Sequence, residues 1–283
     1  MRRLEHTLAP HRIHLEPEGL RDRSVSGRPA GDHDLSPLIP GGEVLIEGDE
    51  AKHAVRVKRL SEGAPVEVLD GLGSIASASV ARTDKQGKAG WVLALRVDSV
   101  RMVEPTRPEL DVWSAPPKGD RLERMIDQLA QAGVASWTPL DADRTVVHPR
   151  DGKLGRLDRV AGEASKQCGR AGRPAIRPSC GMAEALRGAS EDGPTLVVAD
   201  ASGTPYEPSG AGRIRLLVGP EGGWTPAELD RARHAGATVV SFGVHVMRIE
   251  TACVVAAGVI MAGESGRSSS SAVGPASEAG PER

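Results

Sequence analysis

An apolar run, a cluster of glycines and the start of a helix follow one another in residues 213–225, RIRLLVGPEGGWT. The run at 216–218 suits a strand that is buried on both faces. Thr225, Pro226 and Glu228 supply the N-cap, the first-turn proline and the returning carboxylate of a capping box. The glycines therefore occupy the loop beyond the carboxyl end of a strand, where open α/β sheets bind their ligands.

The composition of this loop limits what it can bind. GPEGG lacks the lysine and hydroxyl of GxxxxGK[ST], and it does not have the GxGxxG spacing. A polyanionic nucleotide would meet Glu221 without a compensating lysine, which disfavours ATP, GTP and NAD and favours a cationic or zwitterionic small molecule. The alternative is a tight turn whose glycines only supply positive φ.

A second loop favours ligand binding. The strand at 238–243, TVVSFG, leads through VHVMRIETA into a helix of small residues, with Arg248 and Glu250 near the helix start. We expect this strand and the one before GPEGG to be neighbours, so that both loops meet at one sheet edge. Glu250 is stabilised as an anion near the positive helix end, and a helix cap is its alternative role.

The sequence contains a β-rich segment followed by an alternating strand and helix segment. At 283 residues it is long enough for about two domains. Short runs between Glu43 and Val100 predict a small β-rich barrel or sandwich, and alternating strands and helices after residue 109 predict a mostly parallel sheet with covered faces. Residues 21–42 are typical of a surface loop or insertion, and the low-complexity tail from Ser265 is predicted to be disordered.

Bulk composition excludes several function classes. The net charge is −2 and the pI about 6.5, so nucleic-acid contacts would have to come from local basic patches. One Phe, one Tyr and four Trp argue against a base-stacking platform. Three widely separated cysteines indicate a reducing cytoplasm and no metal site. No run approaches the roughly 20 apolar residues of a membrane span, and the N-terminus lacks the apolar region of a signal peptide.

Several long segments resemble one family. GPEGGWTPAELDRARHAGATVVSFGVHVMRIETA closely resembles the C-terminal signature of the ribosomal RNA small subunit methyltransferase E family. GGEVLIEGDEAKHAVRVKRLSEGAPVEVLDGLG is similar to its PUA-like N-terminal barrel, PPKGDRLERMIDQLAQAGVASWTPLDADRTVV to its first βα unit, and EASKQCGRAGRPAI to its EQSGR segment. The resemblance covers most of residues 11–262. The departures are His245, where the family usually has Arg, Ile249, where it usually has Thr, and an insertion at 21–40.

The resemblance implies a fold and an activity. The family's enzymes are SPOUT-class proteins that use S-adenosylmethionine to methylate N3 of a uridine in the decoding region of 16S rRNA. The implied architecture is a PUA-like β-barrel RNA-binding domain at 1–103, a SPOUT-type parallel-sheet methyltransferase domain at 109–264 and a tail at 265–283. A deep trefoil knot through 195–262 and an obligate homodimer are also implied.

The same resemblance and the chemistry of N3 methylation assign roles to residues. Arg248 would face the negative charge on the base carbonyls, and Glu250 or Glu221 would accept the proton or hold the positive end of the cofactor. The expected cofactor-binding residues are Leu217, Val218, Gly219, Pro220, Glu221, Gly222, Gly223, Phe242, Gly243, Val244, Met247 and Thr251. The expected RNA contacts are Arg12, Lys52, Arg56, Arg59, Lys118, Arg170 and Arg173, each of which could instead be a solvated surface charge.

The implied partners are S-adenosylmethionine, 16S rRNA or the small ribosomal subunit, and a second copy of the chain. No metal and no membrane are expected, and the location is expected to be cytoplasmic. One alternative is a related knotted RNA methyltransferase with another target, such as a ribose hydroxyl. The other is a noncatalytic RNA-binding or ribosome-assembly protein that kept the fold, an option prompted by His245 and Ile249.

Overall fold

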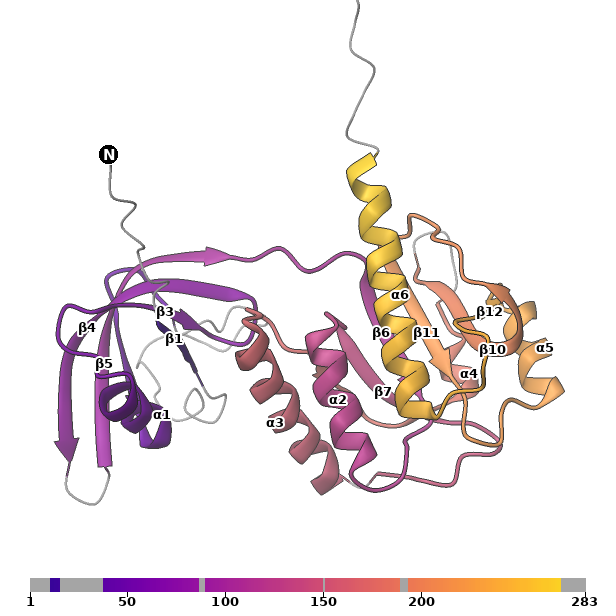
Figure 1. The fold of residues 1–283 in the computed structure, drawn as a ribbon, viewed down its shortest axis with the longest axis horizontal. Helices are drawn as coiled ribbons and strands as arrows, with labels where there is room; N and C mark the ends of the chain where they lie inside the picture. The colour runs from indigo at the N-terminus through magenta and orange to yellow at the C-terminus, as the bar shows by residue number, and fades with distance from the viewer. Residues whose placement is uncertain (1–10, 16–37, 87–89, 150, 189–192, 271–283) are drawn as a thin grey trace, which may run out of the picture. The chain divides into compact units, whose positions relative to one another are not determined.

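The computed structural model describes residues 11–15, 38–86, 90–149, 151–188 and 193–270 (Figure 1). The chain divides into two compact units. Unit 1 comprises Met1–Pro105 together with Ser165–Arg173, and unit 2 comprises Thr106–Ala164 together with Pro174–Arg283.

Unit 1 is built on a five-stranded sheet in the order β1-β3-β4-β5-β2. The strands are β1 (His11–His14), β2 (Glu43–Glu47), β3 (Pro65–Leu69), β4 (Ser74–Gln86) and β5 (Gly90–Met102). β1 pairs parallel with β3, and the remaining pairs are antiparallel. The short runs between Glu43 and Val100 that predicted a β-rich domain form β2, β3, β4 and β5. The four residues of β1 are too few for a recognisable strand pattern.

A helical segment follows β2 in unit 1. It consists of α1 (Gly48–Lys52) and the π-helical turn η1 (His53–Val57). Ala51 and Ala54 are its buried residues, and they belong to the core of this unit. Its basic residues therefore point away from the core. The greater part of the predicted insertion at 21–42 lies outside the described residues.

Unit 2 contains a parallel sheet in the order β12-β10-β11-β6-β7-β8, with β9 also paired to β7. The strands are β6 (Glu109–Ser114), β7 (Ser136–Asp141), β8 (Ala175–Ile176), β9 (Cys180–Gly181), β10 (Thr195–Pro205), β11 (Arg213–Val218) and β12 (Thr238–Ser241). The prediction of a mostly parallel sheet is confirmed. β8 and β9 are two residues long, which is too short for a recognisable pattern.

The helices of unit 2 are α2 (Arg121–Gln131), α3 (Asp151–Cys168, whose last residues belong to unit 1), α4 (Met182–Ala185), α5 (Pro226–His234) and α6 (Ile249–Ser270). In Figure 1, α6 runs across β6 and β11 and lies beside α2. Its buried residues include Ile249, Cys253, Ala256 and Ile260, which are spaced as one face of a helix.

Two expectations need correction. The strands before the two glycine loops, β11 and β12, are not neighbours, because β10 lies between them and pairs with both. α6 continues to Ser270, beyond the predicted start of the tail at Ser265. Glycine and serine lower helix propensity but keep the backbone N–H that a helix needs. The first residue after Ser265 that lacks this N–H is Pro275. Residues 271–283 lie outside the described part.

Candidate functional site

The glycine loop after β11 ends in the capping box that the sequence predicted. Thr225 is the N-cap of α5, its hydroxyl accepts from the Glu228 N–H, and the Glu228 carboxylate accepts from the Thr225 N–H at 2.8 Å. Glu228 is fully buried, and its other oxygen accepts from the Asp143 N–H at 2.9 Å. The start of α5 is therefore fixed both by its own cap and by the loop after β7.

Trp224 fixes the first glycine of the loop. Its indole Nε1 donates to the Ala199 carbonyl of β10 at 3.0 Å, and the side chain is buried. A Cβ added at Gly219 would lie 2.9 Å from the Trp224 ring. Gly219 is therefore required by its close packing on the Trp224 ring.

The end of β10 contains a bulge that the sequence did not predict. Ala199 and Thr204 both pair with Val240 of β12, so the residues between them bulge out of the ladder. A Cβ at Gly203 would meet the Val239 carbonyl oxygen at 2.5 Å, so the bulge depends on that glycine. Asp200 lies in this bulge, where one carboxylate oxygen accepts from the N–H and the hydroxyl of Ser202.

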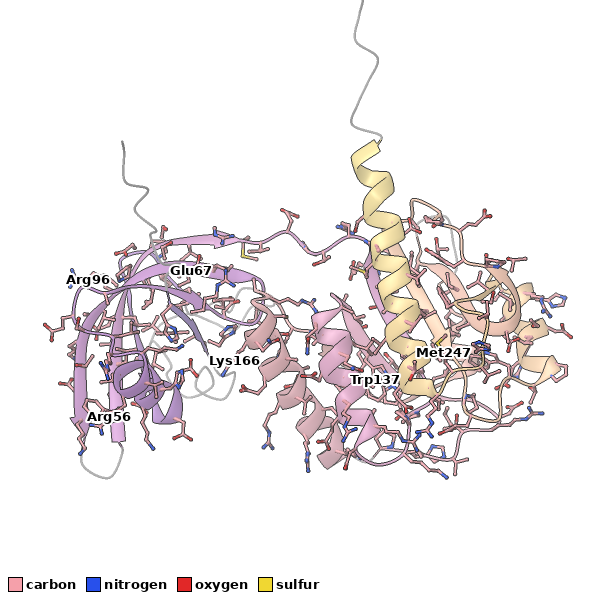
Figure 2. All side chains as sticks on the ribbon, viewed as in Figure 1. Arg56, Glu67, Arg96, Trp137, Lys166 and Met247 are labelled. Atoms are coloured by element: carbon pink, nitrogen blue, oxygen red, sulfur yellow. The ribbon has the colours of Figure 1, made fainter. Side chains whose placement is uncertain are left out.

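The loop after β11, the end of β10 and the segment after β12 line a pocket of about 250 Å³ at the carboxyl ends of these strands. It is lined by Ala199, Asp200, Ala201, Val218, Gly219, Pro220, Glu221, Gly223, Trp224, Ser241, Phe242, Gly243, His245, Val246, Met247, Ile249 and Ala252. Met247, labelled in Figure 2, lies just ahead of α6. Although β11 and β12 are not adjacent, both of their loops reach one pocket because β10 ends between them.

Most of the expected cofactor-binding residues line this pocket. Those that do are Val218, Gly219, Pro220, Glu221, Gly223, Phe242, Gly243 and Met247. The others lie outside its lining: Leu217 is fully buried on the opposite side of β11, Gly222 packs against the Arg144 side chain, and Val244 and Thr251 are exposed. The sequence reasoning missed Asp200, although its place directly after the apolar run TLVVA was a usable indication.

The two expected catalytic residues also lie outside the pocket lining. Arg248 is exposed and has no side-chain hydrogen bond or ion pair with the described residues. Glu250, in the first turn of α6, has its Oε1 3.6 Å from Nη1 of Arg121 at the start of α2. Glu250 Oε2 is buried and has no donor among the described residues. A buried acceptor without a donor is energetically unfavourable, so this oxygen would be stabilised by a proton or by a hydrogen-bond donor.

The chemistry of the lining fits S-adenosylmethionine. Gly219, Gly223 and Gly243 contribute backbone to the lining, and a Cβ at Gly219 could not be accommodated. Apolar and aromatic side chains provide surfaces for a purine ring. Asp200 and Glu221 add two carboxylates, which suit the sulfonium and ammonium charges of that molecule.

The expected RNA contacts lie mainly in unit 1. Arg12 on β1 donates to Glu67 at 2.9 Å, and Lys52, Arg56 and Arg59 are exposed on or just after the helical segment, where Figure 2 labels Arg56. Arg170 and Arg173 belong to the same unit and are partly buried.

The packing within unit 1 brings two of these regions together. A Cβ at Gly169 would meet Nη1 of Arg12, so Arg12 lies against the loop that carries Arg170. Burial lowers the pKa of the Arg170 guanidinium, which stays charged at neutral pH. Lys118, the remaining expected contact, is exposed in unit 2 ahead of α2.

The described residues contain neither a reactive buried cysteine nor a metal-binding cluster. Burial raises the pKa of the Cys180 and Cys253 thiols to about 12, so neither is a thiolate nucleophile at neutral pH. Across the described ranges, His, Cys, Asp and Glu side chains form no group of three that could hold a metal ion. No helix in the same ranges has the length and apolar character needed to cross a membrane.

Comparisons with known proteins place these observations in a family. Residues 104–261 match the family model described as an RNA methyltransferase domain, and residues 46–88 match an RNA methyltransferase PUA domain. The chain is 31% identical over 231 residues to ribosomal RNA small subunit methyltransferase E of Mycobacterium bovis, covering 78% of this chain and 86% of that protein. It is 29% identical to the protein of the same name from Synechocystis, covering 77% and 75%.

Solved structures agree with the sequence relatives. A "probable rRNA-methyltransferase" from Porphyromonas gingivalis is similar with a TM-score of 0.68 and 27% identity, covering 77% of this chain and 92% of that one. Ribosomal RNA small subunit methyltransferase E from Neisseria gonorrhoeae, solved bound to S-adenosyl methionine, has a TM-score of 0.67 at 23% identity, covering 88% and 96%. The expected SPOUT-type α/β fold with a PUA-like domain is confirmed.

Proposed function

This chain belongs to the ribosomal RNA small subunit methyltransferase E family, and we propose that it transfers a methyl group from S-adenosylmethionine to N3 of a uridine in 16S rRNA. The observation that carries the proposal is the pocket at the carboxyl ends of β10, β11 and β12, which lies within the stretch matched by the RNA methyltransferase domain. The decoding region of the small subunit is the proposed location of the uridine.

The pocket residues provide the cofactor site in this proposal. S-adenosylmethionine supplies an electrophilic methyl group on a positively charged sulfur. The backbone of Gly219, Gly223 and Gly243 contacts the cofactor in this proposal, because glycine has no side chain of its own to hold a ligand away. The side chains of Phe242 and Met247 exclude water, which strengthens the interaction of the nearby carboxylates with the positive charge.

The base to be methylated needs both an acceptor for its proton and a partner for its charge. Uridine N3 is a weak nucleophile until its proton is lost or shared. Arg248 is exposed and unpaired among the described residues, so its guanidinium is available to face the base carbonyls as negative charge spreads onto them. Glu250 is the proposed proton acceptor, supported by its unpartnered Oε2, and Glu221 in the pocket is the alternative.

RNA is the proposed partner of the basic surface of unit 1. Arg12, Lys52, Arg56 and Arg59 come from its strands and helical segment, and Arg170 and Arg173 from residues 165–173. Lys118 is a separate proposed contact on unit 2. Contacts of this kind go to phosphates, so they position the RNA without reading its sequence and weaken as salt is raised. Affinity that stays constant across a salt titration would contradict this part of the proposal.

The active form in this proposal is a homodimer. Val244 and Val246 are 93% and 91% exposed in the loop before α6, and Val259 on α6 is 42% exposed. Gly258 and Ala262 on the same helix are also exposed, and small residues allow a second helix to approach closely. Sedimentation of the purified chain as a monomer would contradict this assembly.

The trefoil knot through 195–262 stays a prediction, and a cytoplasmic location follows from the proposed substrate.

Nucleoside mass spectrometry tests the activity directly. Small ribosomal subunits that lack the modification are incubated with the purified chain and S-adenosylmethionine, then digested and analysed. We expect 3-methyluridine, lost with Arg248→Ala and strongly reduced with Glu250→Gln. Arg233→Ala, which removes an exposed arginine of α5, is the matched control and should leave the product unchanged.

Other outcomes separate the alternatives. Detection of a different methylated nucleoside would support methyltransferase activity but assign it to another target atom or nucleotide. The departures His245 and Ile249 both line the pocket, so a noncatalytic RNA-binding protein is the second candidate. RNA binding without methylation and without binding of S-adenosylmethionine would establish that second candidate.

A further inference from the structure

The chain contains a single tyrosine and a single phenylalanine, and the two rings stack on each other. The centroids of Tyr206 and Phe242 are 5.3 Å apart, with 25° between the ring planes. Phe242 lines the pocket, whereas Tyr206 does not. The Tyr206 N–H also donates to the carbonyl of Ser241, the residue before Phe242, at 3.2 Å. Tyr206 therefore contacts one pocket residue by its ring and the neighbouring one by its backbone.

The hydroxyl of Tyr206 is held by a buried carboxylate at the other end of α6. It donates to Oε1 of Glu264 at 2.6 Å. Glu264 is 2% exposed, and it also accepts from the N–H and hydroxyl of Ser209 and from the N–H of Gly210 at 2.7 Å. Burial alone would raise the pKa of Glu264, but these donors outweigh it and leave the pKa below its usual value. Glu264 is thus an anion that orients the Tyr206 hydroxyl.

The loop that carries Tyr206 is packed tightly on α6. A Cβ at Gly263 would lie 2.8 Å from Cγ of Pro208, so only glycine allows this approach. α6 in turn contributes Ile249 and Ala252 to the pocket at its opposite end. The aromatic wall and the helical wall of the pocket are therefore connected through Tyr206 and Glu264.

We propose that Tyr206 and Glu264 are positioning residues that hold the Phe242 ring in the wall of the cofactor pocket. The inference rests on the proposed function, in which this pocket binds S-adenosylmethionine. Phe242 is only partly buried and its ring would otherwise rotate among several orientations, which binding would have to restrict. The stacked Tyr206 ring, itself fixed by Glu264, imposes that restriction before the cofactor arrives. Neither residue needs to touch the cofactor.

The experiment uses the fact that Phe242 is the only phenylalanine. Full-length protein labelled with 4-fluorophenylalanine gives one ¹⁹F resonance, which reports the Phe242 environment with and without S-adenosylmethionine. Wild-type protein should give a narrow line that shifts on cofactor addition. Tyr206→Leu and Glu264→Gln should each shift or broaden the line of the cofactor-free protein. An unchanged line in both variants would overturn the proposal.

Calorimetry measures the consequence for the cofactor. Tyr206→Leu should weaken S-adenosylmethionine binding by about tenfold, and Tyr206→Phe, which keeps the ring but loses the hydroxyl, by about threefold. Glu264→Gln should resemble Tyr206→Phe. In the methylation assay, the KM for the cofactor should rise more than kcat falls, because the residues act on binding. Glu207→Gln, which neutralises an exposed carboxylate next to Tyr206 in the sequence, is the matched control with little change.

The outcomes distinguish this inference from a purely structural role and from failure of the proposed function. A lowered melting temperature with unchanged cofactor affinity would make Tyr206 and Glu264 structural only and overturn the proposal. If Tyr206→Leu does not fold, the milder Tyr206→Phe and Glu264→Gln carry the test. If wild-type protein binds no S-adenosylmethionine, the proposed function fails, and the ¹⁹F line of the cofactor-free protein still decides whether Tyr206 positions Phe242.

Discussion

Arg144 donates from Nη1 to the carbonyl oxygen of Gly222 at 2.7 Å. Arg144 lies in the loop after β7, and Gly222 lies in the glycine loop after β11. The contact therefore joins two loops at the carboxyl edge of one sheet, and the bond from the Asp143 N–H to Glu228 joins the same β7 loop to α5. The glycine loop is thus supported from outside by the β7 loop, in addition to its own Trp224.

Loss of this support should weaken cofactor binding. Arg144→Ala removes the hydrogen bond to Gly222 and frees the loop beside the pocket. The bond is charge-assisted but exposed, so we expect a loss of affinity for S-adenosylmethionine of about three- to tenfold. Calorimetric titration measures it. Arg159→Ala, which removes an exposed arginine of α3 in the same unit, should bind normally, and equal affinities for all three proteins would contradict the role of Arg144.

A methyl group at Gly219 should distort the pocket. Gly219→Ala places Cβ 2.9 Å from the ring of Trp224, which is held by its bond to Ala199. We expect destabilisation by about 1 to 3 kcal/mol and a large loss of cofactor affinity. Chemical denaturation and calorimetry measure the two effects. Gly212→Ala is the control, because a Cβ there meets nothing within 4 Å. Similar behaviour of the two variants would show that Trp224 moves aside freely.

The sequence predicted the local features of the site because their causes are local. The capping box at Thr225 and Glu228 depends on residues a few positions apart, and the structure contains it. The GPEGG loop follows an apolar strand directly, and the structure places it between β11 and α5. Such patterns need no knowledge of the rest of the chain.

Features that depend on distant residues could not be predicted in this way. The bulge that brings Asp200 into the pocket exists because Ala199 and Thr204 both pair with Val240, some forty positions away. The position of β10 between β11 and β12 has the same origin. The contact of Arg121 with Glu250 joins α2 to α6, and no hydrophobic pattern in the sequence indicates it. Resemblance to a family predicted the architecture, but not these contacts.

Removal of the buried cap carboxylate should destabilise unit 2. Glu228→Ala empties a fully buried position and leaves the partly buried N–H groups of Thr225 and Asp143 without their acceptors. We expect the free energy of unfolding to fall by about 2 to 4 kcal/mol, measured by urea denaturation. Glu207→Ala removes an exposed carboxylate from the same unit and should change it by less than about 0.5 kcal/mol. Equal stability of the two variants would argue that water replaces the lost acceptor.

His11 should make the stability of unit 1 depend on pH. Burial, Lys58 and His53 all lower the pKa of His11, so the folded state binds its proton less readily than the unfolded state. His11 Nε2 is buried and has no partner among the described residues, and its ring centroid lies 6.3 Å from that of His53. The stability contributed by neutral His11 is present above the unfolded pKa of about 6.5 and is lost as pH falls below it.

His11→Gln should remove that part of the pH dependence, because glutamine keeps a polar side chain but takes up no proton. Urea denaturation of the wild type between about pH 5 and pH 8 should give a free energy of unfolding that rises with pH and then levels off. The variant should show a shallower rise, and NMR titration of wild-type protein should place the His11 pKa below 6.5. A measured pKa above that value, or identical slopes for the two proteins, would mean that burial, Lys58 and His53 do not lower the pKa of His11.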